Sequence, residues 1–257
     1  ALSMSEPMPL VAGLPLYDWP EVAVATDRLW AAISKNLGKQ GVDAPDFLWR
    51  PADLTELWDH PILLVGQMCG LPFIEKYQSR GQVQMLGSLE FSLDGPPGSY
   101  HSVLVCRRGN PAKTLADFAG QRAAINEVGS QSGEAALRQA VHEYGVNFSE
   151  TMVSGSHRDS IKQIAEDYSD VAAIDAVSWC LALDHEPAAQ ELRVFQRTAP
   201  TPGVALVVAN QQAHLRPQII RALNEALAGL DPEIKSALHL KGFVAREASD
   251  YQVLLGG

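Results

Sequence analysis

Short apolar segments of strand length alternate with helical segments along most of the chain, and this alternation constrains the fold more than any other feature. The segments typical of strands are residues 10–16, 62–66, 83–86, 102–106, 122–125, 151–153, 171–174, 192–195 and 204–208. The segments typical of helices are residues 20–36, the stretch after Pro72, and residues 132–144, 160–167, 176–183 and 217–230. This pattern predicts an α/β fold with parallel sheets covered on both faces. In such sheets ligands bind beyond the carboxyl ends of the strands, so the segments that follow the strands are the candidate sites.

The charge of the 257-residue chain excludes several classes of partner. Its formal net charge is −10, and it therefore lacks the positive field that attracts nucleic acids and anionic membrane surfaces. No apolar stretch approaches the roughly 20 residues of a membrane span, so we expect no direct membrane insertion. Residues 1–9 lack the basic start and apolar centre of a signal peptide. Either such a peptide has been removed, or the protein never carried one.

The chain offers no pattern for metal binding, cofactor binding or catalysis. Cys69, Cys106 and Cys180 are odd in number and far apart, which predicts free, partly buried thiols and not a disulfide framework or a zinc site. The remaining histidines are scattered without metal-ligand spacing. A Walker loop, a dinucleotide fingerprint and a nucleophile elbow are all missing from the sequence. We therefore expect no metal, no cofactor and no catalytic residue.

The segment Ser130-Gln131-Ser132-Gly133 is the first candidate binding site. It follows a predicted strand and opens a predicted helix. The first backbone N–H groups of a helix have no partner within the helix, and hydroxyl side chains with a glycine suit close approach of a phosphate-sized anion. The alternative is that a serine here only caps the helix, which is a common structural role.

Two further candidates follow later strands. His157, in Gly155-Ser156-His157, could donate a hydrogen bond to an anion, or could be an ordinary structural histidine. Asp175 comes directly after an apolar strand, where a carboxylate could bind a ligand ammonium or order a hydroxyl. It could equally cap the next helix.

Aromatic and polar residues at other strand ends complete the candidate site. Tyr17 and Trp19 follow the first strand and could form one wall of a pocket, or could plug the start of a helix. The other residues in comparable positions, after a strand or at the start of a crossover, are Gln67, Cys69, Tyr100 and His101.

In this order, the segments resemble one family. The segments that carry the resemblance are Leu14-Pro15-Leu16-Tyr17-Asp18, Gln67-Met68-Cys69-Gly70, Asn126-Glu127 through Gly133, Gly155-Ser156-His157 and Ala172-Ala173-Ile174-Asp175. From about residue 10 to residue 245 the chain is similar to the phosphonate-type, PhnD-like substrate-binding proteins of ABC transporters. The Ser-x-Ser-Gly helix start and the Gly-Ser-His segment are the most specific parts.

The resemblance implies a two-lobed periplasmic-binding-protein-like (type II) fold with a ligand cleft between the lobes. One lobe would comprise residues 9–101 plus 203–257, and the other residues 102–202. The family's oxyanion loop would correspond to Ser130, Gln131, Ser132 and the N–H of Gly133, its histidine to His157, and its ligand-facing carboxylate to Asp175. Gln131 stands where a small hydroxyl residue often occurs in phosphonate binders, and residues 198–201 contain no second acid to hold an aminoalkyl ammonium.

The expected function is capture of a small oxyanion by hinge closure, in the periplasm and for an ABC-transporter permease. Phosphonate, phosphate, phosphite, a sulfonate and a small carboxylated molecule all remain open as ligands. We expect a monomer. A second hypothesis is an enzyme on the same fold, for which Cys69 is the only candidate nucleophile and would need a lowered pKa. A ligand-sensing domain and a cytoplasmic binding protein are also compatible with the sequence.

Overall fold

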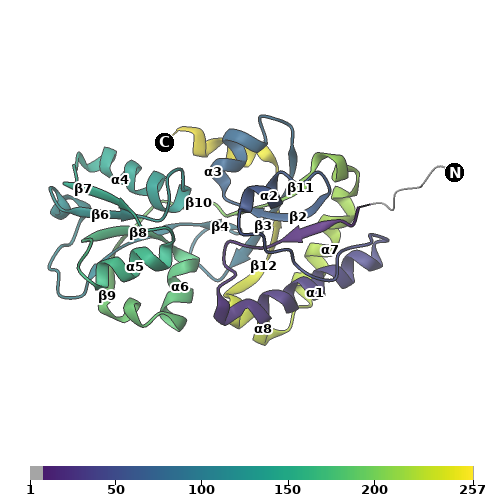
Figure 1. The fold of residues 1–257 in the computed structure, drawn as a ribbon, viewed down its shortest axis with the longest axis horizontal. Coiled ribbons are helices and arrows are strands. Elements are labelled where there is room, and N and C mark those ends of the chain that lie inside the picture. The colour runs from purple at the N-terminus through teal and green to yellow at the C-terminus, as the bar shows by residue number, and fades with distance from the viewer. Residues whose placement is uncertain (1–7, 257) are drawn as a thin grey trace.

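The computed structural model describes residues 8–256 and has two lobes, each built around a five-stranded sheet (Figure 1). The first sheet has the order β1 (Val11–Gly13), β2 (Leu63–Met68), β11 (Ala205–Ala209), β3 (Val83–Phe91) and β12 (Leu240–Ala245). The second has the order β7 (Glu150–Val153), β6 (Arg122–Ile125), β8 (Val171–Asp175), β5 (Ser102–Arg107) and β9 (Leu192–Arg197). Between them, β4 (Ser99–Tyr100) pairs antiparallel with β10 (Thr201–Pro202), so the two chain crossovers lie side by side.

Both large sheets are mixed, and the prediction of parallel sheets was wrong in this respect. In the first sheet only β1 and β2 are parallel neighbours, while β11 and β12 are antiparallel to the strands beside them. In the second, β6 is parallel to β7 and β8, but β5 runs antiparallel to β8 and β9. The chain enters β5 and β11 shortly after a crossover, so these strands start near the cleft, where their neighbours end. Alternation of strands and helices does not report that direction.

Helices cover the faces of both sheets. In the first lobe they are α1 (Ala23–Lys39), α2 (Leu54–Trp58), α3 (Gly70–Pro72) with the π-helical turn Phe73–Tyr77, α7 (Arg216–Ala228) and α8 (Pro232–Leu238). In the second they are the π-helical turn Gln131–Ala135 leading into α4 (Ala136–Tyr144), α5 (His157–Ala165) and α6 (Ala176–His185). Short 3₁₀ turns occupy Pro20–Val22, Leu115–Phe118, Pro187–Glu191, Asn210–Leu215 and Ala248–Gly256. None of the helices within residues 8–256 is long and apolar enough to cross a membrane.

Local sequence explains several of these elements. Pro20 opens the first turn, where its missing N–H costs nothing, and α1 then buries Leu29, Ile33 and Leu37 on one face. Ser156 caps α5 by accepting a hydrogen bond from the Asp159 N–H, so this helix begins three residues earlier than its apolar residues predicted.

One element of the second lobe packs into the core of the first. Val177 and Leu181 of α6 are buried in the same apolar cluster as Leu14, Tyr17 and Phe91. Their exposed fractions are 0% and 1%. The lobes are therefore joined by an apolar contact as well as by the β4–β10 crossover.

Candidate ligand-binding site

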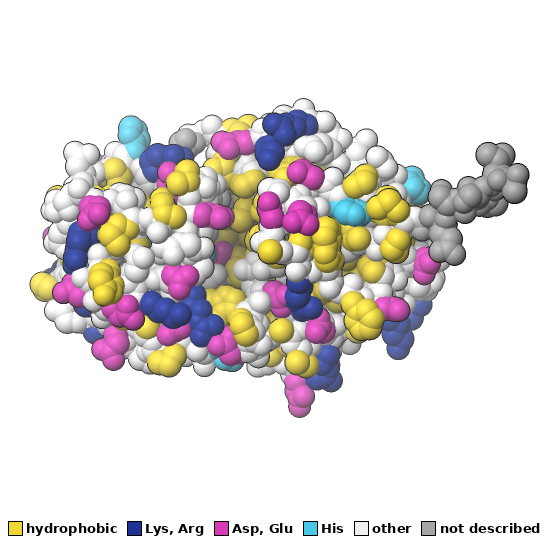
Figure 2. All heavy atoms as spheres, in the orientation of Figure 1, with side chains coloured by type: hydrophobic (Ala, Val, Ile, Leu, Met, Phe, Trp, Pro, Cys, Tyr) yellow, Lys and Arg dark blue, Asp and Glu magenta, His cyan; other side chains and the backbone are white. Residues whose placement is uncertain are grey.

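A cavity of about 420 Å³ lies between the lobes, at the carboxyl ends of strands from both sheets. Figure 2 shows the groove from one side, with hydrophobic side chains along its floor and acidic side chains at its edges. The first lobe and its crossover contribute Pro15, Leu16, Tyr17, Asp18, Trp19, Pro20, Leu54, Cys69, Tyr100 and Val204 to the lining. The second lobe contributes Asn126, Glu127, Ser130, Ser132, Gly155, Ser156, His157, Arg158, Asp175 and Ser178.

The hydroxyl loop and the histidine lie together on the second lobe. The Oγ of Ser132 is 2.7 Å from Nε2 of His157, although the two residues are 25 positions apart. Ser130 accepts a hydrogen bond from the N–H of Gly133 at 3.3 Å, which caps the helical turn that begins there. The hydroxyl of Ser102 donates to the carbonyl of Ser132 at 2.7 Å and ties the loop to the neighbouring strand β5. The cap role and the cavity position therefore coexist in this loop.

His157 is neutral and keeps one ring nitrogen unused. Burial lowers its pKa from 6.5 to about 4, so the ring carries no charge at pH 7. Its Nδ1 is buried and has no hydrogen-bond partner among the described residues. If Nε2 accepts the Ser132 hydroxyl proton, Nδ1 carries the ring N–H as a donor. The ring can therefore offer a hydrogen bond without bringing a positive charge into the cavity.

Asp175 joins the two lobes and caps a helix at the same time. The hydroxyl of Tyr17 donates to its Oδ2 at 2.6 Å from the first lobe. Its Oδ1 accepts the N–H groups of Val177 and Ser178 at 2.7 and 2.9 Å, at the start of α6. Burial raises the pKa of Asp175 to about 6, and these three hydrogen bonds hold it down in part. A buried carboxyl with this pKa sits close to its protonated state at neutral pH.

The lining also contains residues that the sequence did not single out. Arg158, directly after His157, places its guanidinium 4.6 Å from the centre of the Trp19 ring and pairs with Glu21 and Glu186. Glu127 is exposed at the cavity, and partial burial raises the pKa of its carboxyl. Both residues neighbour predicted ones in sequence, which is the only signal that could have pointed to them.

Four predicted site residues do not line this cavity. Gln67 is buried, and its Oε1 accepts the N–H of Leu16 at 3.0 Å, so it positions the loop that carries Tyr17. His101 and Gln131 face a small separate void behind the serine loop. Gly133 serves through its backbone, because a Cβ there would lie 1.8 Å from the side-chain oxygen of Asn126.

Cys69 and Tyr100 line the cavity as weakly acidic, buried groups. Burial raises the pKa of the Cys69 thiol to about 12, with further increases from the nearby carboxylates of Glu127 and Asp175. Burial also raises the pKa of Tyr100 well above its ordinary value. A thiol with this pKa stays protonated at neutral pH and is a poor nucleophile, which opposes the enzymatic hypothesis. The residues described contain no cluster of three or more side chains that could hold a metal ion.

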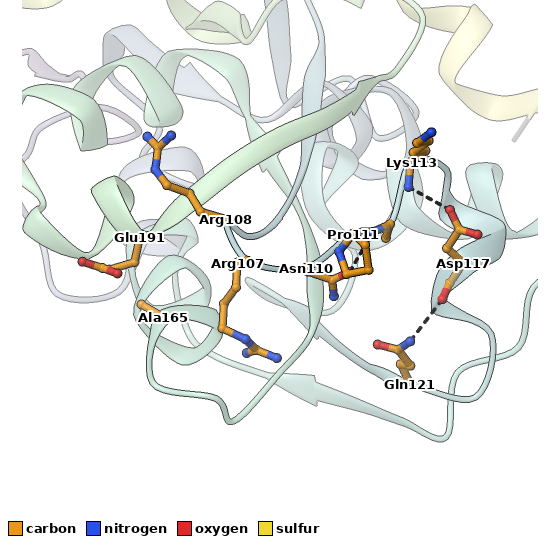
Figure 3. A pocket seen from close by; sticks show the side chains of 11 residues that line it. Arg107, Arg108, Asn110, Pro111, Lys113, Asp117, Gln121, Ala165 and Glu191 are labelled. Atoms are coloured by element: carbon orange, nitrogen blue, oxygen red, sulfur yellow. Dashed lines mark hydrogen bonds between the residues drawn. The ribbon is translucent and has the colours of Figure 1, made fainter.

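A larger hollow, of about 750 Å³, lies elsewhere on the second lobe, around residues 107–113 (Figure 3). Arg107, Arg108 and Lys113 point in different directions there. Arg107 is held by Asp170 at 2.9 Å, and Arg108 donates to the carbonyl of Gln190 at 2.6 Å. These charges do not converge on a common point, so the cleft between the lobes is the better candidate site.

The fold and the cleft define a class of protein. Two α/β lobes joined by paired crossovers, with the polar ends of their strands facing a shared cavity, form the type II periplasmic binding protein fold. A family described as the periplasmic substrate-binding proteins of phosphonate ABC transporters matches residues 65–251. The chain belongs to this family. No curated protein matches the chain.

Solved structures share the fold at low sequence identity. PhnD1 from Prochlorococcus marinus in complex with methylphosphonate has 17% identity and a TM-score of 0.73 over 96% of each chain. A binding protein component of an ABC phosphonate transporter from Pseudomonas aeruginosa has 15% identity and a TM-score of 0.73, over 96% of this chain and 84% of that one. The protein XAC2383 from Xanthomonas citri, bound to chloride, has 17% identity and a TM-score of 0.70, over 96% and 98%.

Proposed function

We propose that this protein captures a small oxyanion in the cleft by closure of its lobes and delivers it to an ABC-transporter permease. The observation that carries the proposal is the convergence of Ser130, Ser132 and His157 on a cavity that the opposite lobe closes with Tyr17 and Trp19. The family supports a small-molecule ligand and a permease partner. We propose further that the protein acts as a monomer in the periplasm, where members of this family work.

Neutral hydrogen-bond donors would hold the anion. A dehydrated anion is costly to bury unless its oxygens are hydrogen-bonded. The hydroxyls of Ser130 and Ser132 and the unpaired Nδ1 of His157 supply such donors without a net charge. A hydroxyl that turns toward an anion leaves its present serine or histidine partner, so binding exchanges internal hydrogen bonds for ligand hydrogen bonds.

Asp175 would select ligands that carry a proton. A fully deprotonated oxyanion would repel its carboxylate, whereas a ligand hydroxyl or ammonium could donate to it. Phosphate esters have a second pKa of about 6, so phosphorus oxyanions retain a proton in a large fraction of molecules near neutral pH, and a sulfonate does not. The chemistry of this carboxyl therefore favours phosphonate, phosphate or phosphite over sulfonate.

Closure would bring the two groups of binding residues together. We propose lobes of residues 9–101 plus 203–257 and residues 102–202, with the hinge at the β4–β10 pair. A ligand that contacts both lobes binds the closed form better than the open form and shifts the population toward it.

The test is a thermal-shift and calorimetric comparison of phosphite, phosphate, methylphosphonate, methanesulfonate and acetate. A ligand at about 100 times its Kd adds roughly 2.7 kcal/mol of stability, which corresponds to several degrees in Tm. We expect a phosphorus oxyanion to produce this shift, and Ser132→Ala to abolish it. Ser149→Ala is the matched control, because Ser149 is exposed on the same lobe and outside the cavity lining. If no phosphorus oxyanion shifts the wild-type transition, the proposed ligand class is wrong.

A further inference from the structure

Arg158 connects the two lobes at the edge of the cavity. Its Nη1 and Nη2 donate to the two carboxylate oxygens of Glu21 at 3.0 and 2.9 Å, in the bidentate geometry that makes such pairs strong. Its Nε donates to Glu186 at 2.7 Å. Glu21 follows the first strand of one lobe, and Glu186 follows α6 of the other.

The second lobe alone holds the guanidinium in position. The side chain of Glu186 is only 8% exposed, and it also accepts the N–H of Ala188. Nη2 of Arg158 donates in addition to the carbonyl of His185 at 3.2 Å. These contacts lie within one lobe and can persist when the lobes separate. The contact with Glu21 joins the two lobes and must break on opening.

The same contact covers one wall of the ligand cavity. The guanidinium lies over the ring of Trp19, 4.6 Å from its centre, and both residues line the cavity. Four of the five guanidinium N–H groups are already used by Glu21, Glu186 and His185. Arg158 is therefore arranged to hold the lobes together and not to receive an anion.

We propose that Arg158 and Glu21 form an interlobe latch, preorganised by Glu186, that stabilises the closed form and sets how slowly a bound ligand leaves. This inference rests on the proposed capture of a ligand in the cleft. Glu21, Arg158 and Trp19 act here as positioning residues: they determine the lifetime of closure, while the serine loop and His157 contact the ligand.

The variant Glu21→Gln separates this role from direct anion binding. It removes the ion pair and leaves the cavity lining and the Glu186–Arg158 pair in place. We expect the dissociation rate of methylphosphonate, measured by stopped-flow fluorescence, to rise about three- to tenfold, since partly exposed ion pairs have effects of this order. If Arg158 instead binds the anion itself, the same substitution frees its guanidinium and binding becomes tighter. That result, or an unchanged dissociation rate, overturns the latch.

A measurement without ligand keeps the latch testable if methylphosphonate does not bind. Small-angle X-ray scattering of the unliganded protein should give a larger radius of gyration for Glu21→Gln than for wild type. Glu233→Gln is the matched control, with the same charge change at an exposed α8 residue that forms no ion pair within the described residues. Equal radii for wild type and Glu21→Gln overturn the latch. Failure of all phosphorus oxyanions to bind would instead contradict the proposed function.

Discussion

Replacing Asp175 by asparagine should stabilise the unliganded protein at neutral pH. The asparagine Oδ1 can still accept the N–H groups of Val177 and Ser178, and its amide can donate to the Tyr17 oxygen. The substitution therefore keeps the helix cap and the contact between the lobes. What it removes is a buried negative charge.

The size of the effect follows from the pKa of the carboxyl. Burial raises this pKa from 3.8 to about 6. A carboxyl with a raised pKa binds more protons in the folded than in the unfolded state between these values, so its contribution to stability is lost as pH rises from 3.8 through 6. Above pH 6 the loss amounts to about 3 kcal/mol, because each pKa unit corresponds to about 1.4 kcal/mol. At pH 4.5 it is only about 1 kcal/mol.

Urea unfolding of wild type and Asp175→Asn at pH 7.5 and 4.5 tests this reasoning. Groups common to both proteins cancel in the difference. We expect the free energy of unfolding of the variant to exceed that of wild type by up to about 3 kcal/mol at pH 7.5, and the advantage to shrink by about 2 kcal/mol at pH 4.5. A difference that is the same at both pH values would refute the assignment of a raised pKa to Asp175.

Three further substitutions probe other parts of the cleft. Burial lowers the pKa of His157 from 6.5 to about 4, so this residue contributes stability above pH 6.5 that is lost as pH falls toward 4; His157→Gln should lose less stability in that window, as measured by thermal unfolding. Leu181→Ala should lower the free energy of unfolding by about 2–5 kcal/mol in urea because it opens a cavity where α6 meets the other lobe, whereas Leu183→Ala, 44% exposed on the same helix, should change it by less than about 0.5 kcal/mol. Gly133→Ala should abolish the ligand-induced thermal shift because its Cβ would collide with Asn126, while Gly38→Ala, with open space around its Cβ, should raise stability by up to about 1 kcal/mol.

The sequence predicted the position of the strand ends well and their direction poorly. Apolar runs such as residues 122–125 and 171–174 coincide with β6 and most of β8, because a buried strand needs a continuous apolar segment. The antiparallel direction of β5 and β11 depends on where the chain crosses between lobes, which no local pattern records. α2 spans only five residues, too few to show a helical period, and was missed.

The candidate site divides along the same line. Ser132 and His157 follow β6 and β7, which are adjacent parallel strands, so their proximity follows from strand order and could be anticipated. Gln67 was misplaced because both faces of β2 are buried, and a residue on it can point away from the cleft. The Arg158–Glu21 pair joins residues 137 positions apart on different lobes, and nothing near either residue announces the partner.

A protein with a net charge of −10 can hold an anion because recognition and closure rely on different forces. Arg158 is the only cation among the described residues that line the cavity, and its N–H groups are largely occupied by carboxylates. Recognition must then come from serine hydroxyls and a neutral histidine, whose hydrogen bonds act at short range inside a closed cavity. Salt screens such contacts little, but it weakens a partly exposed ion pair. Ligand dissociation that accelerates with salt in wild type and not in Glu21→Gln would therefore report the latch, whereas a matching acceleration in both proteins would place the salt-sensitive interaction at the ligand itself.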